Sequence, residues 1–224
     1  MKSTSLARIY LVFLLVVGGI FLPHPPASAH SPTSYFTAGK WPTSQVISYG
    51  INIGFPTGSW RSRLVEAKDQ WNNSASTGEP KIYWYLADDV NHGSAGDPCG
   101  ISGFNTAAIF WNDLDYLGSN WVAATRLCPQ TLNSTIYNFT IEFDSTRSNW
   151  YSGNADNPGG NVDFWSVATH EFGHALGFWE HIPESDGACP DDSTRATMCP
   201  STYLGTERQR TVSPHDVHTF DAAY

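Results

Sequence analysis

The chain has 224 residues and a formal net charge of −9, with 12 Lys and Arg residues against 21 Asp and Glu residues. This acidic balance argues against a nucleic-acid partner, because binding to a phosphate backbone depends on clustered positive charge. No stretch after the first 29 residues is apolar enough to span a membrane.

The first 29 residues have the features of a secretory signal peptide. The basic residues Lys2 and Arg8 precede an apolar run over 9–22, and a small-residue cleavage site ends at Ala29. The apolar run, about 14 residues, is shorter than the roughly 20 that cross a bilayer. We therefore expect a secreted, extracellular protein, without membrane attachment after cleavage, that forms a single domain over 30–224.

The first half of the mature chain predicts a strand, a helix and a second strand. Alternating side chains predict a strand over 45–53, and apolar residues spaced by three and four predict a helix over 60–72 with Ser59 as its cap. Residues 81–86 are rich in strand formers. A strand, a helix and a strand in this order predict a crossover connection and a parallel pair of strands.

The second half begins with a Gly-, Pro-, Asn- and Asp-rich loop, predicted over 88–103. Further strands are predicted over 105–111, 121–127 and 136–144. A final helix is predicted over 214–223, because Ser213 and Pro214 fit a cap followed by the first helical residue. Its residues Val217 and Phe220, together with Tyr224, are expected to face the core.

The most informative stretch contains His170, Glu171 and His174 in the pattern H-E-x-x-H. Two histidines four residues apart on a helix lie about 40° apart around its axis, so both rings can reach one metal ion. A helix is supported by an apolar stripe on its other side, formed by Trp165, Ala168, Phe172, Ala175 and Leu176. We place its start near 161 or 162 and its end at Gly177, which tolerates positive φ.

These residue types indicate a catalytic zinc site. Zn²⁺ binds neutral imidazole nitrogen, and a catalytic site has three protein ligands and one open position. Glu171, next to the first ligand, is placed to accept a proton from water. The alternative is a buried helix that carries two incidental histidines.

The four cysteines predict two disulfides, because an even number in an exported chain is usually paired. Three pairings are possible. We prefer Cys99–Cys128 and Cys189–Cys199, because each would link one loop-rich segment. The competing interpretation is a four-cysteine zinc site, but the C-x₂-C spacing typical of such sites is absent.

Three separated pieces of the chain resemble the metzincin clan of zinc endopeptidases, and most of all its matrixin branch. They are H-E-F-G-H-A-L-G-F over 170–178, Met198 within A-T-M-C-P, and the closing segment over 213–224. The resemblance implies an α+β (α/β), zincin-like fold with a twisted, mostly parallel sheet of about five strands and three helices, the middle one carrying H-E-x-x-H. It also implies that His170 and His174 bind zinc, that Glu171 is the general base, and that Met198 forms a turn beneath the metal.

The third ligand departs from the family pattern. The pattern H-E-x-x-H-x-x-G-x-x-H places this ligand at position 180, where the chain has Glu180, and His181 follows one residue later. Either residue can bind zinc. We favour His181, because the family's usual donor is imidazole and a loop absorbs an extra residue easily. Glu180 then remains an alternative third ligand or a carboxylate that orients a ligand ring.

The resemblance implies a zinc-dependent endopeptidase whose partner is an extended peptide or protein, and we expect the protein to be a monomer. In the family such a substrate docks on an edge strand of the sheet, for which 105–111 is the candidate. Two alternatives stay open: a catalytically silent, exported binding domain on the same scaffold, and a gluzincin-type peptidase with Glu207 as third ligand. Structural Ca²⁺ at Asp113 and Asp115, or at Asp88 and Asp89, is a further option, although acidic pairs in loops are usually only hydrated.

Overall fold

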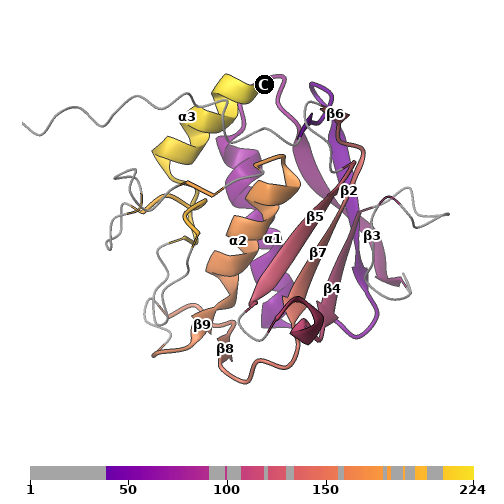
Figure 1. Cartoon of the computed structure of the whole chain (residues 1–224), viewed down its shortest axis with the longest axis vertical. Coiled ribbons are helices and arrows are strands. Elements are labelled where there is room, and N and C mark those ends of the chain that lie inside the picture. The colour runs from indigo at the N-terminus through magenta and orange to yellow at the C-terminus, as the bar shows by residue number, and fades with distance from the viewer. Residues whose placement is uncertain are drawn as a thin grey trace, which may run out of the picture.

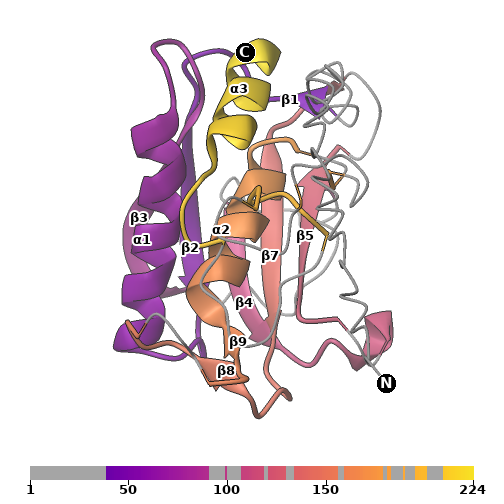
Figure 2. The same cartoon turned by 90° about the vertical axis from the view of Figure 1, so that its left-hand side faces the viewer.

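The computed structural model describes residues 39–90, 99, 107–118, 121–129, 134–155, 159–178, 181–182, 189, 195–200 and 209–224. In these parts of the chain, two helices pack on one face of a sheet, and a third helix lies on the same side (Figures 1 and 2). The predicted signal peptide over 1–29 lies outside the described residues.

The central sheet has five strands in the order β3-β2-β4-β7-β5. Their bounds are Val46–Asn52 for β2, Lys81–Val90 for β3, Ala107–Asn112 for β4, Ala123–Cys128 for β5 and Asn138–Asp144 for β7. Strand β5 runs antiparallel to β7, whereas the other neighbouring pairs are parallel. The predicted parallel pair formed by the first two long strands is therefore confirmed.

Short elements complete the described strands. Gly39–Lys40 (β1) pairs with Ser134–Thr135 (β6), and Trp150–Tyr151 (β8) pairs with Val162–Asp163 (β9). A single 3₁₀ turn, η2, spans Asp115–Leu117. The predicted loop over 88–103 begins too early, because β3 continues to Val90 through its pairing with β2.

The prediction that residues 105–111 form the edge strand is wrong. Strand β4 lies between β2 and β7, and Ala107 to Phe110 are all buried, as expected for an interior strand. Strand β5 forms an edge of the sheet, because it pairs only with β7 among the described strands. This edge strand contacts the helix that carries H-E-x-x-H.

The three helices span Ser59–Ser74 (α1), Phe164–Ala175 (α2) and Pro214–Ala223 (α3). Together with the mostly parallel five-stranded sheet, they confirm the predicted α+β fold class with H-E-x-x-H on the middle helix. Helix α1 is capped by Gly58 at φ 68° and not by Ser59, which is its first residue. Glycine adopts this left-handed conformation without the cost that other residues incur.

Helix α2 begins two or three residues later than predicted, because Val162 and Asp163 form β9. The Asp163 carboxylate caps the helix by accepting a hydrogen bond from Ser166 N at 3.0 Å. Helix α3 has the predicted bounds, with a capping box between Ser213 and Asp216.

The core lies between the sheet and helix α2. On β7 the alternate residues Phe139, Ile141 and Phe143 are fully buried, and they face the stripe that the sequence predicts for α2. In that stripe Ala168, Phe172, Ala175 and Leu176 are at most 1% exposed, whereas Trp165 is half-buried. Each large apolar side chain buried here contributes about 1.5–3 kcal/mol. The stripe therefore fixes α2 against the sheet and turns its histidine face away from the core.

Helix α3 and the chain end close the core. Phe220 is buried and Tyr224 packs against the core, but Val217 is only half-buried, contrary to the prediction. The Tyr224 hydroxyl donates to the Leu176 carbonyl at 2.7 Å, which ties the chain end to the end of α2.

The cysteines are paired as the sequence analysis prefers, Cys99 with Cys128 and Cys189 with Cys199. The first disulfide links the end of β5 to Cys99, and the second joins Cys189 to the turn that contains Met198. Within the described residues, no helix is both long and apolar enough to cross a membrane.

A buried carboxyl group near α3 gives the fold a testable pH dependence. Glu79 accepts a hydrogen bond from Ser76 N, and the Ser76 hydroxyl donates to Asp221 of α3 at 3.0 Å. Burial, followed by hydrogen bonding with Asp221, raises the pKa of Glu79 from its ordinary value of 4.5 to about 7. The folded protein therefore binds this proton more tightly than the unfolded chain does.

Replacing Glu79 by Gln is expected to remove this pH dependence. The proton stabilises the folded state fully below pH 4.5, and its contribution is lost as the pH rises to about 7. The free energy of unfolding of the unmodified protein should therefore fall relative to that of Glu79→Gln across this window, as measured by urea unfolding. Glu66→Gln on α1 is the control. A Glu79→Gln difference that does not change with pH would contradict the assignment.

Candidate metal centre

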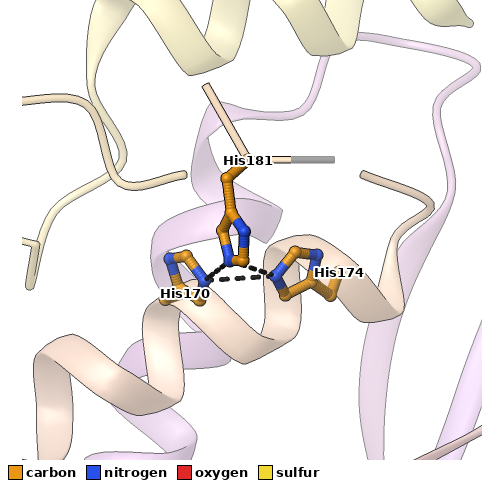
Figure 3. Close-up of side chains that lie close together, drawn as sticks. All are labelled: His170, His174 and His181. Carbon is orange, nitrogen blue, oxygen red and sulfur yellow. Dashed lines mark hydrogen bonds between the residues drawn. The ribbon is translucent and has the colours of Figure 1, made fainter. Parts of the chain in front are cut away.

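Three histidine rings converge beside helix α2 (Figure 3). His170 and His174 lie one turn apart on the helix, and His181 approaches from the segment after it. The Nε2 atom of His174 lies 3.1 Å from that of His170 and 3.2 Å from that of His181, and the third distance is 3.1 Å. The structure thus brings together the favoured third residue and the two helix histidines, while Glu180 lies outside the described residues.

A turn at Gly177 returns the chain to the helix. Gly177 has φ 113°, a conformation that favours glycine. Phe178 N donates to Gly173 O at 3.2 Å, which closes the helix end. Beyond the turn, Ile182 N donates to Met198 O at 2.9 Å. The backbone next to His181 is therefore held by the segment that contains Met198.

The hydrogen bonds of the two helix histidines fix their tautomers. His170 Nδ1 lies 2.7 Å from Thr197 O, and His174 Nδ1 lies 2.5 Å from Phe178 O. A carbonyl oxygen can only accept, so each Nδ1 carries the proton and each Nε2 carries a lone pair. Metal-bound histidines are usually oriented in this way, through a second ring nitrogen that donates to a carbonyl.

The environment keeps the three rings neutral. Burial, followed by the neighbouring His174 and His181, holds the pKa of His170 well below its ordinary value of 6.5. Burial and then His181 lower the pKa of His174 to about 4. Partial burial also lowers the pKa of His181. Neutral imidazoles are the form that binds a metal ion.

The donor set and its spacing fit zinc. Three imidazole nitrogens bound at about 2.0–2.1 Å with tetrahedral angles are about 3.3 Å apart, close to the observed 3.1–3.2 Å. At most one of the three Nε2 atoms, that of His181, can carry a proton, so at least one Nε2 lone pair receives no hydrogen bond from another ring. A cation satisfies all three.

Among the described residues, these histidines form the one group of three potential metal ligands. At the predicted calcium candidates, Asp113 instead accepts a hydrogen bond from Asp115 N at 2.8 Å. The side chains of Asp88 and Asp89, like Glu207 of the gluzincin alternative, lie outside the described parts of the structure.

Met198 is fully buried directly against α2. A Cβ atom added at Gly173, between the two helix histidines, would lie 2.3 Å from Met198 Sδ and 2.7 Å from Trp71 Cζ2. Only glycine allows this close approach. The soft thioether therefore packs beneath the histidine pair, where the sequence resemblance implies a methionine turn.

The turn at residues 196–198 is held by α3. Asp216 is fully buried, and its two carboxylate oxygens accept from Thr197 N at 2.6 Å and Met198 N at 3.3 Å. Gln209 Nε2 donates a hydrogen bond to the Thr197 carbonyl oxygen, which also accepts one from His170 Nδ1. The roles of Asp216 and Gln209 at this turn were not predicted from the sequence. Ser213 and Asp216 do match a capping box, but that signal predicts only a helix start.

Glu171 lies on the same helix and is 6% exposed. Its Oε2 accepts a hydrogen bond from the Thr125 hydroxyl of β5 at 2.6 Å. Burial raises the pKa of Glu171 to about 7, and the hydrogen bond from Thr125 opposes this shift. Such a carboxyl group can both accept and release a proton near neutral pH.

The histidines and Glu171 line a cleft of about 640 Å³ whose wall is β5. Further lining side chains are mainly apolar: Leu117, Trp121, Val167, Phe178 and Pro200. Because β5 pairs only with β7 among the described strands, its other edge offers backbone groups for pairing. The cleft thus combines an open strand edge with a potential metal site.

No protein-family model matches this chain, and no curated protein matches it. Among solved structures, it is similar to myroilysin, with 16% sequence identity over 90% of this chain and 89% of that chain and a TM-score of 0.43. Any assignment of function therefore rests on the geometry of the site.

Proposed function

We propose that this protein is a secreted, zinc-dependent endopeptidase of the metzincin type. The observation that carries the proposal is the convergence of three imidazole Nε2 atoms, 3.1–3.2 Å apart, beside a buried glutamate in a cleft walled by a strand edge. The signal-like first 29 residues and the two disulfides support export to an oxidising compartment.

His170, His174 and His181 would hold the zinc ion. When bound, zinc supplies Lewis acidity, which polarises the scissile carbonyl and lowers the pKa of water. Glu171 then accepts the proton of the attacking water and passes it to the departing amine. Its buried position, next to the histidines in the same cleft, supports this role.

The proposed substrate is an extended peptide segment of a protein. It would add to the free edge of β5 through backbone hydrogen bonds and place side chains against the apolar walls of the cleft. We propose that the mature protein, residues 30–224, acts as a monomeric single domain.

Metal analysis combined with a digestion assay tests the proposal. The purified protein should contain about one zinc ion per chain, digest an unfolded protein substrate, lose this activity with a chelator and regain it with added zinc. His181→Ala should lose zinc, because the site needs its third imidazole, whereas His218→Ala on the exposed side of α3 should retain it. A folded protein that is metal-free and inert would instead favour the silent binding domain.

A further inference from the structure

Thr125 stands out because its face of β5 is otherwise apolar. Its neighbours on this face, Ala123 and Leu127, are 7% and 2% exposed. In the antiparallel register Thr125 is opposite Ile141, which is fully buried under the helices. Residues directly opposite each other in such a pair face the same side. The Thr125 hydroxyl is therefore directed towards helix α2. If this side chain only packed against the helix, an apolar residue would serve equally well.

This hydroxyl contacts Glu171 twice. Thr125 Oγ1 lies 2.6 Å from Glu171 Oε2 and 3.2 Å from the Glu171 carbonyl oxygen. The hydroxyl has one proton, and the shorter contact is typical of a charge-assisted hydrogen bond to a carboxylate. Among the described residues, Thr125 is the hydrogen-bond donor that the structure provides for this carboxylate.

The hydrogen bond from Thr125 makes the two carboxylate oxygens of Glu171 inequivalent. Oε2 is held by the edge strand, so Oε1 is the oxygen that remains for contact with a ligand in the cleft that Glu171 lines. A glutamate side chain has three rotatable torsions, and an unheld carboxylate would sample several positions. A general base acts only when it is within hydrogen-bond reach of the proton that it accepts.

We propose that Thr125 is a positioning residue that fixes the Glu171 carboxylate by hydrogen bonding, so that one oxygen faces the substrate. This inference rests on the proposed function, in which Glu171 is the general base. It also links catalysis to substrate docking, because the strand that holds the base is the strand on which the peptide would pair.

Two substitutions separate positioning from packing. Thr125→Val keeps the shape of the side chain and removes the hydroxyl, whereas Thr125→Ser keeps the hydroxyl and removes the methyl group. Thr140→Val on β7 is a matched control: Thr140 is 2% exposed, and its hydroxyl has no hydrogen-bond partner in the described structure. This control measures the effect of the same substitution elsewhere in the sheet.

The experiment measures kcat, KM and zinc content with a peptide substrate. Thr125→Val should lower kcat by about 10- to 100-fold, the rate equivalent of one hydrogen bond to a charged group. Its KM should change by less than about twofold and its zinc content should stay unchanged, because neither docking nor the metal ligands depend on the hydroxyl. Thr125→Ser should stay within about threefold of the unmodified kcat, and Thr140→Val should match the unmodified protein.

A second comparison tests whether Thr125 acts through Glu171. In a Glu171→Gln background, Thr125→Val should cause no further loss of the residual activity, because the group that Thr125 positions is already inactive. If Thr125→Val does not fold, Thr125→Ala takes its place in both comparisons.

An unchanged kcat in Thr125→Val, an equal loss in Thr125→Ser, or a full additive loss in the Glu171→Gln background would overturn the proposal. An unmodified protein that is inert and zinc-free would overturn the proposed function itself, and the role of Thr125 with it. An active, zinc-loaded protein with an insensitive Thr125 would overturn only the present inference.

Discussion

Glu171→Gln is expected to retain zinc and to lose peptide cleavage by about 10²- to 10⁴-fold, the usual contribution of a general base. The amide keeps the size of the side chain, and its oxygen still accepts the hydrogen bond from Thr125. It cannot accept a proton from water at neutral pH. The three histidines are unchanged, so the loss should appear in kcat and not in metal content.

The same variant should be at least as stable as the unmodified protein. Glu171 is 6% exposed, and burying a neutral amide costs less free energy than burying a carboxylate. Zinc content, unfolding in urea and kcat should be measured on one preparation, with Glu66→Gln on α1 as a control. Full cleavage activity in a folded, zinc-loaded Glu171→Gln protein would rule out this residue as the base.

The parts of the site that depend on neighbours in the sequence could be predicted. The spacing of His170 and His174 follows from helix geometry alone, and Gly177 marks a turn because few other residues tolerate its φ of 113°. The bounds of α3 follow from Ser213 and Pro214, whose cap and fixed φ are local effects. His181 is favoured over Glu180 in the sequence because the resemblance implies an imidazole donor and because a loop absorbs an extra residue easily.

The parts that depend on distant contacts could not be predicted. Strand order decides whether β4 or β5 forms the edge, and a run of apolar residues cannot distinguish an interior strand from a half-covered one. Thr125 and Glu171 are 46 positions apart in the sequence, and they meet because β5 pairs antiparallel to β7 next to helix α2. Asp216 reaches Thr197 and Met198 because α3 packs behind the turn. Each of these contacts belongs to the packing of the whole chain.

The start of α2 depends on a buried ion pair between Arg210 and Asp163. Arg210 donates to the two Asp163 carboxylate oxygens from Nη2 at 2.7 Å and from Nε at 2.8 Å. The two residues are 6% and 2% exposed, and the guanidinium lies 5.2 Å from the centre of the Trp165 ring. Because Asp163 also caps α2, this pair connects the helix that carries the histidines to the segment before α3.

Arg210→Met is therefore expected to lower the free energy of unfolding by about 3–5 kcal/mol, because it leaves the Asp163 carboxylate buried without a partner charge. The matched control is Arg63→Met. Arg63 also lies over the Trp165 ring, 4.9 Å from its centre, but its partner Glu66 has a side chain that is 39% exposed. Loss of that pair should cost less than about 1 kcal/mol.

The double variant Asp163→Asn/Arg210→Met should recover part of the loss, since no unpaired charge then remains and the Asn oxygen can still cap the helix. Urea unfolding followed by tryptophan fluorescence measures all three variants. Equal losses in Arg210→Met and Arg63→Met would show that stacking on Trp165, and not the buried ion pair, fixes the start of the helix. A larger loss in Arg210→Met, partly recovered in the double variant, would place the stabilisation in the pair itself.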